Sequence, residues 1–198
     1  TIATAISLVL GIPCAYGFAR FQIFAEKELR FWLLSIVMMP PVVAAIPIFS
    51  IWANLGLIDS HLGLAIAHTI FNLPLVIWLM IGFFKEVPRE IEEAAEIDGC
   101  GSLQTLLFVS LPVAKSGLAT VTTLSFILSW NELLFASILT QRNAQTLPPA
   151  IGALWKDFGL LWGQIGAITV VATVPVLIIG FFLQKHLVRG LTLGAVKE

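Results

Sequence analysis

The chain has 198 residues, of which 58% are hydrophobic and only 12% are charged, and its formal net charge at pH 7 is -1. Soluble globular domains carry about 25% charged residues, so this composition and a mean hydropathy of +0.96 indicate an integral membrane protein. The near-zero charge gives no indication of nucleic-acid binding, the two cysteines indicate neither a disulfide framework nor a Cys/His metal cluster, and no GxxxxGKS or GxxxxGKT phosphate-binding loop is present.

Five stretches are long and apolar enough to cross a bilayer, whose hydrocarbon core requires about 20 residues of helix. They should be helical, because lipid offers the backbone no hydrogen-bond partner. The sequence therefore predicts an all-α fold, a polytopic membrane helix bundle that forms a single domain over residues 1–198. These stretches cover approximately residues 1–19, 31–54, 62–84, 113–139 and 163–184.

Two features modify this count of spans. Pro40 and Pro41 lie inside the second stretch and are expected to kink it, since each removes a backbone donor. The chain also begins inside an apolar stretch without an initiator methionine. We therefore expect the N-terminus to be missing, including further spans; the family resemblance given below implies one such span, which would make six.

Lysine and arginine predict the orientation of the chain. Alternating the five spans places nine of these residues on one side, and only Arg142 and Lys156 on the other. Because cytoplasmic loops carry the excess of positive charge, the linker 20–30, the segment 85–115 and the C-terminus are expected in the cytoplasm. The loops 55–61 and 140–162 are expected outside.

The segment EEAAEIDGCG, residues 92–101, concentrates charge in an otherwise apolar chain. Pro88 favours the start of a short helix, whose first turn suits negative charge, and Gly99 suits the left-handed residue after its end. Small side chains and carboxylates on this helix fit a groove of a partner protein, and a solvated acidic loop is the open alternative. The carboxylates concerned are Glu92, Glu93, Glu96 and Asp98.

A second short helix is predicted directly after this turn. Ser102 is expected to cap it, and it should run to about Leu111. Pro112 then marks the start of the fourth span. The segment 85–115 is thus predicted to be a pair of short helices tethered between two spans.

The string EAAEIDG, followed by LFVSLP, resembles the EAA loop of ABC importer permeases. That pattern is Glu-Ala-Ala, three residues, Gly, and about nine residues to a hydrophobic-x-Leu-Pro ending. In that family the loop forms coupling helices that sit in a cleft of a cytoplasmic ATPase subunit, with Glu93 as the implied charged contact. The residues implied to couple this chain to the ATPase are Glu93, Ala94, Ala95, Asp98, Gly99, Leu111 and Pro112.

Two further matches narrow the resemblance. WNELLFA at residues 130–136 resembles the WNEF-type segment of carbohydrate-uptake permeases, and LVRGLTLGAVKE resembles the tail of the maltose-transporter-type second permease, usually RGLTAGAVKG. This chain departs from that tail at Leu193 and Glu198. The tail residues implied to point towards the ATPase are Gly190, Leu191, Thr192, Gly194 and Lys197.

The resemblance implies a permease subunit of an ATP-driven, binding-protein-dependent sugar importer in a bacterial or archaeal cytoplasmic membrane. The chain would not be an enzyme and would hold no cofactor or metal, because ATP and Mg²⁺ would bind the partner ATPase. The implied partners are a second permease, two ATPase subunits and an extracytoplasmic solute-binding protein. Two alternatives stay open: an importer of polyamine, phosphonate or amino acid, and a stand-alone secondary transporter.

Polar residues inside the spans give the remaining candidates. Ser129, Asn131 and Glu132 are expected either to line the route of a hydroxylated solute or, for Glu132, to be solvated near the outer interface. Glu132 also interrupts the fourth stretch, so the alternative of a shorter fourth span stays open. His68 is expected to be a structural hydrogen-bonding residue with Asn72 as its partner.

The outer loop 140–162 contains Pro148 and Pro149 and three aromatic residues, Trp155, Phe158 and Trp162. Its position indicates a contact with an extracytoplasmic binding protein. The tryptophans alternatively belong to the aromatic belt at the membrane interface.

Overall fold

The computed structural model describes residues 1–157 and 162–192, with side chains described up to Leu154 and from Trp162 to Phe181. In this part of the chain every regular element is helical, which confirms the predicted all-α fold. The elements in chain order are α1 (Ile2–Arg20), α2 (Glu26–Met38), α3 (Pro41–Asn54), α4 (His61–Glu86), α5 (Arg89–Ile97), α6 (Ser102–Thr105), the π-helical turn η1 (Leu106–Ser110), α7 (Leu111–Val113), α8 (Lys115–Trp130), α9 (Leu134–Leu139), α10 (Leu147–Asp157) and α11 (Trp162–Thr192).

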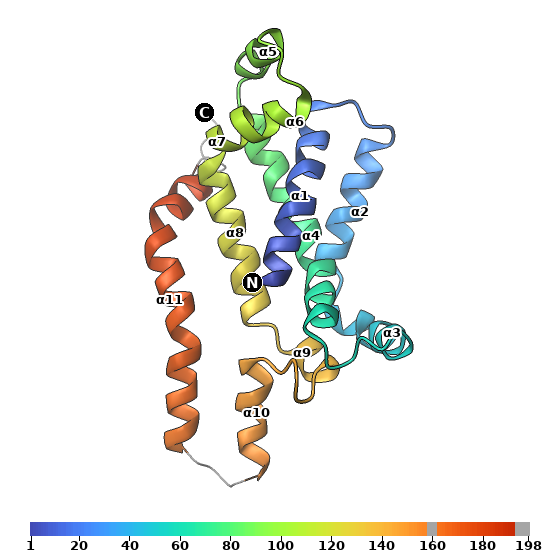
Figure 1. The fold of residues 1–198 in the computed structure, drawn as a ribbon, viewed down its shortest axis with the longest axis vertical. Coiled ribbons are helices and arrows are strands. Elements are labelled where there is room, and N and C mark those ends of the chain that lie inside the picture. The colour runs from blue at the N-terminus through green and yellow to red at the C-terminus, as the bar shows by residue number, and fades with distance from the viewer. Residues whose placement is uncertain (158–161, 193–198) are drawn as a thin grey trace.

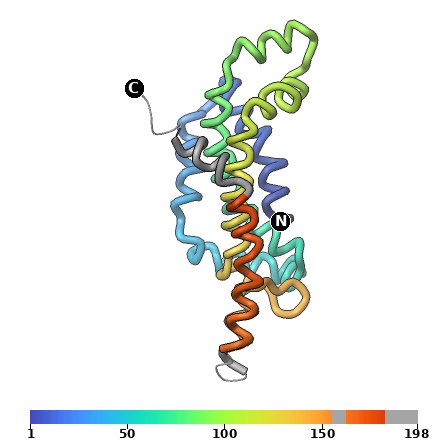
Figure 2. The backbone as a smooth tube through the Cα atoms, turned by 90° about the vertical axis from the view of Figure 1, so that its left-hand side faces the viewer, coloured from blue at the N-terminus to red at the C-terminus, as the bar shows by residue number. Residues whose placement is uncertain are grey.

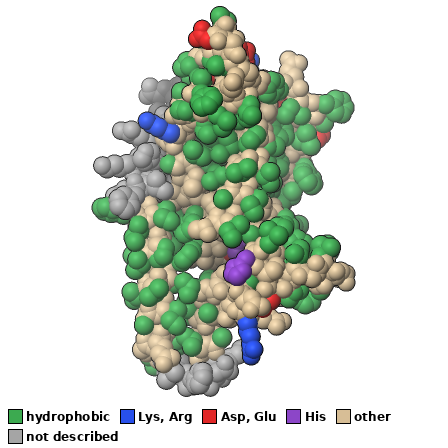
Figure 3. Space-filling view, in the orientation of Figure 1, with side chains coloured by type: hydrophobic (Ala, Val, Ile, Leu, Met, Phe, Trp, Pro, Cys, Tyr) green, Lys and Arg blue, Asp and Glu red, His purple; other side chains and the backbone are tan. Residues whose placement is uncertain are grey.

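The helices α1, α4 and α8 form the centre of the bundle, with α2 on one flank and α11 on the other (Figure 1). The short elements α5 to α7 lie at one end, and α3, α9 and α10 lie at the opposite end. Figure 2 shows the α5–α7 segment extending beyond the long helices. In Figure 3 hydrophobic side chains cover the middle of the visible face and charged ones lie towards its ends, as a lipid-facing surface requires.

Within the described residues, three helices are individually long and apolar enough to cross a membrane: α1, α4 and the part of α11 from Trp162 to Phe181. They match the predicted spans 1–19, 62–84 and 163–184. Two sharply bent helix pairs, Glu26–Met38 with Pro41–Asn54 and Ser102–Val113 with Lys115–Trp130, meet the same criteria when each pair is taken as one span. Counting them gives up to five spans in the described residues.

The predicted span 31–54 is broken into α2 and α3, which meet at 91°. Met39 and Pro40 both have extended backbone, with ψ of 128° and 122°. Each precedes a proline, whose ring clashes with a helical conformation of the residue before it. The kink is confirmed, and the tandem of prolines makes it a right-angle break.

The predicted span 113–139 is not one continuous helix, and the alternative of a shorter span interrupted at Glu132 is confirmed. The helix α8 ends at Trp130, and α9 starts at Leu134. Between them the Glu132 carboxylate accepts the backbone N–H of Phe135 at 2.9 Å and of Ala136 at 3.0 Å. A carboxylate in this position satisfies donors that have no partner at a helix start, so it favours a new helix over continuation of the old one.

Buried apolar side chains hold both ends of the bundle to α4. Near α5 the core includes Tyr16, Val76 and Phe84, and the Tyr16 ring meets the Phe84 ring edge-on, with centroids 5.5 Å apart. At the α9 end Trp52 and Phe135 belong to a second cluster that joins α3, α4 and α9. The long helix α4 is therefore the common scaffold for the two ends.

Gly117 allows α8 to approach α4 closely. A methyl group added there would lie 2.2 Å from Cγ of Phe83. We expect Gly117→Ala to destabilise the protein by about 1–3 kcal/mol, because an overpacked site must displace its neighbours. Thermal unfolding in detergent measures this effect. Gly82→Ala is the matched control, since an added methyl group meets nothing within 4 Å; equal unfolding temperatures for the two variants would contradict the close approach.

Candidate functional site

The acidic segment forms the helix α5, which begins directly after Pro88 and ends at Ile97. Gly99 has a φ of +91°, so the predicted left-handed residue is confirmed. Its N–H donates to the carbonyl of Glu96 at 3.0 Å, and the Cys100 N–H donates to the carbonyl of Ala95 at 2.9 Å. These bonds close the helix and turn the chain towards α6.

The second arm starts one residue earlier than predicted. The N-cap is Gly101, whose N–H donates to Oε1 of Gln104 at 2.9 Å, and Ser102 is already the first helical residue. The prediction that Ser102 caps this helix is wrong, because the Gln104 amide fixes the start at Gly101.

This arm is also longer than predicted. Helical structure continues from Ser102 through the π-helical turn to Val113, and the direction changes by 86° before α8. Leu111 and Pro112 therefore belong to the arm, and the prediction that Pro112 starts the fourth span is wrong. We call residues 88–114 the α5–α7 segment (Figure 1).

The α5–α7 segment exposes most of its predicted coupling residues. Of the predicted set, Glu93, Ala94, Asp98, Gly99 and Pro112 are exposed, whereas Ala95 and Leu111 are half-buried. Large apolar side chains are exposed beside them, with Ile97 at 86%, Phe108 at 73% and Leu103 at 63%. Apolar side chains at the end of a membrane bundle, among carboxylates, indicate a protein contact surface rather than a lipid-facing one.

Glu92 differs from the other three carboxylates of residues 92–101, because it is buried. Its carboxylate pairs with the Arg20 guanidinium, through Nε on Oε2 and through Nη2 on Oε1 at 3.1 Å. The Ser110 hydroxyl donates to Oε1 at 2.6 Å. The expectation that Glu92 belongs to the partner-facing carboxylates is therefore wrong: it joins α5 to the rest of this chain.

Two of the three candidate residues of the solute route, Glu132 and Ser129, belong to two separate hydrogen-bond groups. Glu132 contacts His68, with Oε2 and Nε2 3.0 Å apart. Asn72 donates to the Ser129 hydroxyl at 2.6 Å. The prediction that Asn72 is the partner of His68 is therefore wrong, although both side chains are buried. Asn131 is exposed and donates to the carbonyl of Ile127.

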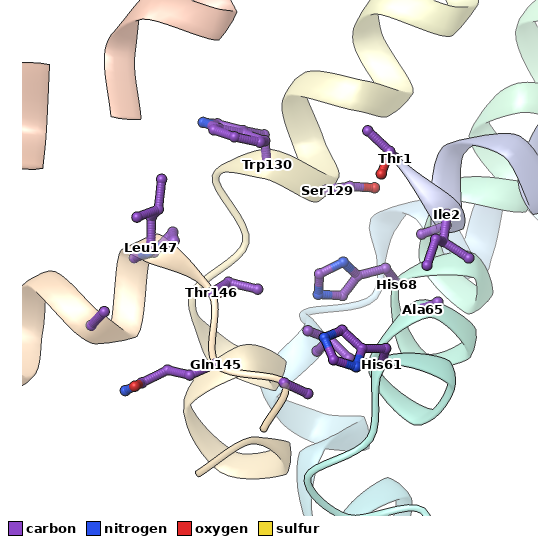
Figure 4. Close-up of a pocket in the computed structure, with 15 residues that line it drawn as sticks. Thr1, Ile2, His61, Ala65, His68, Ser129, Trp130, Gln145, Thr146 and Leu147 are labelled. Carbon is purple, nitrogen blue, oxygen red and sulfur yellow. The ribbon is translucent and has the colours of Figure 1, made fainter. Parts of the chain in front are cut away.

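A cavity of about 380 Å³ lies beside these groups, between the start of α1, the start of α4, the end of α8 and residues 144–150. Ser129 and His68 line it, whereas Asn131 and Glu132 do not, so Glu132 borders the cavity only through His68. Figure 4 shows His61 and His68 near each other on α4, facing Gln145 and Thr146. The wall thus combines a few hydrogen-bonding side chains with apolar ones and the indole of Trp130, a composition typical of pockets for small molecules.

At the α9 end, Asp59 joins two loops that are far apart in the sequence. Its carboxylate accepts backbone N–H groups from residues 141–144, at distances from 2.8 to 3.2 Å. These bonds, from Gln141 and Asn143 above all, hold the pKa of Asp59 well below its usual range. The loop before α4 is thereby fixed to the loop before α10. Nothing in the local sequence pointed to this contact.

Several predicted positions lie outside the described residues or side chains. Of the outer-loop aromatics, only Trp162 has a described side chain, and it is exposed, while Pro148 and Pro149 lie at the start of α10. Gly194 and Lys197 are outside the described residues, and Gly190, Leu191 and Thr192 lie at the end of α11 without described side chains. Among the described residues no group of three or more His, Cys, Asp or Glu is placed to hold a metal ion.

Glu132→Ala should destabilise the α9 end, because the substitution removes a helix cap and leaves the buried His68 without its carboxylate. Loss of a cap alone costs about 1 kcal/mol. We expect a lower thermal unfolding temperature, whereas Ser137→Ala, at an exposed position in α9, should leave it unchanged. If both variants unfold at the temperature of the unaltered protein, the carboxylate does not stabilise α9.

Comparison with known proteins agrees with this geometry. The family described as binding-protein-dependent transport system inner membrane component matches residues 7–193. The chain is 38% identical over 199 residues to the trehalose transport system permease protein SugB of Mycobacterium tuberculosis, covering 99% of this chain and 73% of the relative. It is 29% identical over 199 residues to the trehalose/maltose transport system permease protein MalG of Thermococcus litoralis, covering 100% and 72%.

A solved structure gives the same result. A chain of a bacterial ABC transporter involved in the import of the acidic polysaccharide alginate superposes with a TM-score of 0.74 at 29% identity. The superposition covers 93% of this chain and 70% of that one.

Proposed function

This chain belongs to the family of binding-protein-dependent transport system inner membrane components, and on that basis we propose that it is one of two membrane halves of an ATP-driven sugar importer. The partner half, two ATPase subunits and an extracytoplasmic solute-binding protein complete the assembly. The chain itself makes and breaks no covalent bond. ATP and Mg²⁺ bind the ATPase subunits, and this chain converts the movement of those subunits into alternating access for the solute.

One observation carries the coupling part of the proposal. The helix α5 extends from the end of the bundle with Glu93 and Ala94 exposed on it, Ile97 86% exposed, and Gly99 exposed in the turn that follows. Small residues permit close approach of a partner, and the carboxylate supplies a charged contact at the edge. In this proposal the α5–α7 segment and the C-terminus face the cytoplasm, and the positive charge of the flanking loops supports that orientation.

The relatives and the cavity support a sugar as the solute. The names of the relatives above specify trehalose and maltose, and the solved structure belongs to an importer of a polysaccharide. The cavity presents His61, His68, Ser129 and Gln145 beside the indole of Trp130, and hydroxyl groups bind such donors and acceptors while a sugar ring packs on an aromatic face. Polyamine, phosphonate and amino acid are the competing solutes.

A stand-alone carrier is the weaker alternative. Proton coupling uses chains of acidic and His residues in the spans. In the described part of the chain the Glu132 carboxylate is already bonded to His68 and to two backbone N–H groups. This arrangement supports a structural role for the pair.

Transport in reconstituted vesicles tests the proposal. The complete complex with its binding protein is expected to accumulate radiolabelled trehalose or maltose only when ATP is supplied on the side of the α5–α7 segment. Spermidine and methionine serve as competing solutes. Uptake that continues unchanged after removal of the ATPase subunits would contradict an ATP-driven importer, and uptake of spermidine or methionine in place of sugars would contradict the solute class.

A further inference from the structure

Arg20 and Glu92 bring four parts of the chain together at one buried point. Arg20 is the last residue of α1, Glu92 lies in α5, and Ser110, which donates to the same carboxylate, ends η1. The two charged side chains are 72 positions apart in the sequence and are 8% and 7% exposed. Nη2 of Arg20 also donates to the carbonyl of Val87 at 2.7 Å, at the end of α4.

The Arg20–Glu92 contact constrains the two side chains more than a single hydrogen bond would, because two bonds join them. A guanidinium that donates two parallel bonds to one carboxylate fixes both the distance and the orientation of the two groups. Burial strengthens the attraction and makes separation of the charges costly. Movement of α5 away from α1 would have to break all of these bonds together.

The helix α1 leads from this contact to the cavity. It contains 19 residues, which corresponds to a length of about 28 Å at 1.5 Å per residue. Arg20 is at one end, and Thr1, Ile2 and Ala3 at the other end line the cavity of about 380 Å³. Figure 1 shows α1 running between the two regions beside α4.

We infer that Arg20 and Glu92 are positioning residues that join α5 to α1, so that a displacement of α5 by the ATPase is carried along α1 to the cavity. This inference rests on the proposed function. Glu93 and Glu92 then have separate roles: Glu93 faces the partner, and Glu92 transmits the movement inside this chain. The Ser110 hydroxyl adds η1 to the moving unit, so both arms of the α5–α7 segment follow the same displacement.

The ratio of solute transported to ATP hydrolysed tests the inference in the complete complex, reconstituted in vesicles with its binding protein. Arg20→Lys and Glu92→Asp each keep the charge. The lysine cannot donate the two parallel bonds of a guanidinium, and the aspartate side chain is one methylene shorter and does not reach as far. We expect both variants to assemble and to hydrolyse ATP, with the ratio lowered about fivefold or more, the lower end of typical coupling effects. A pair with a purely structural role would lower assembly without changing this ratio.

A matched control is available on the same side of the bundle. Glu26 and Arg30 form a half-buried ion pair within α2 at 2.9 Å, and Glu26→Gln should leave the ratio unchanged. An unchanged ratio in Arg20→Lys and Glu92→Asp would overturn the inference while leaving the proposed function intact. If neither variant protein is recovered from the membrane, the double variant Arg20→Met with Glu92→Leu replaces them, because it leaves no unpaired charge. It is expected to assemble and to show the lowered ratio of solute transported to ATP hydrolysed. A normal ratio in the double variant would overturn the inference. Absence of ATP-dependent uptake in the unaltered complex would overturn both.

Discussion

Gly99→Val is expected to lower ATP-driven uptake about tenfold or more while the protein still inserts into the membrane. The φ of +91° at this position is unfavourable for any residue with a β-carbon, and most unfavourable for a β-branched one. A left-handed conformation costs an L-residue about 1–2 kcal/mol, which corresponds to roughly a tenfold loss in the population of the turn. The turn places α5 relative to α6, so the contact surface for the ATPase would be misplaced.

The control for this variant lies two positions further along. Gly101 has a φ of −75° and is an N-cap, so Gly101→Thr adds a side chain of the same shape as valine where the backbone accepts it. Uptake and co-purification with the ATPase subunits should both remain near those of the unaltered complex. If the Gly99 and Gly101 variants transport equally well, the left-handed turn is not needed for coupling.

The largest effect on stability is expected at the buried ion pair. Arg20→Ala leaves the Glu92 carboxylate buried without its cation, and breaking such a pair typically costs about 3–5 kcal/mol. Thermal unfolding in detergent should therefore shift further than for any surface substitution. Glu92→Ala is expected to shift it comparably, because the guanidinium is then the unpaired group.

Removal of both charges distinguishes the cost of an unpaired charge from the value of the pair itself. The variant Arg20→Met with Glu92→Leu fills a similar volume, and replacements of this kind are often neutral for stability. We expect it to unfold close to the unaltered protein and well above either alanine variant. A double variant as unstable as the sum of the single ones would show that the two side chains do not interact.

Local sequence signals were sufficient for features that depend on neighbouring residues. Hydropathy located α1, α4 and α11, and the glycine after an acidic helix indicated the left-handed turn at Gly99. Hydropathy could not show that the runs 31–54 and 113–139 each contain a break, because a bent apolar segment has the same composition as a straight one. The prolines indicated the first break and the charge of Glu132 indicated the second, but only the contacts of Glu132 show how a new helix starts there.

The candidate site shows the same limit. Glu92 and Glu93 are adjacent and chemically identical, yet one is buried against Arg20 and the other faces outward. The position of α1, which carries Arg20, determines which of the two glutamates is buried. The local sequence around α5 gives no information about that position. The contact of Asp59 with residues 141–144 is of this kind as well, since loops so distant in the sequence meet only when the helices between them pack.

Labelling of Cys100 tests the central claim that the α5–α7 segment is a cytoplasmic contact surface for an ATPase. Cys100 is partly exposed in this segment, and Cys14→Ser removes the other cysteine of this chain. A membrane-impermeant maleimide should label Cys100 in inside-out vesicles but not in right-side-out ones, and bound ATPase subunits should slow the labelling. Labelling of Cys100 only from the outer side, or at a rate that the ATPase does not change, would contradict the account.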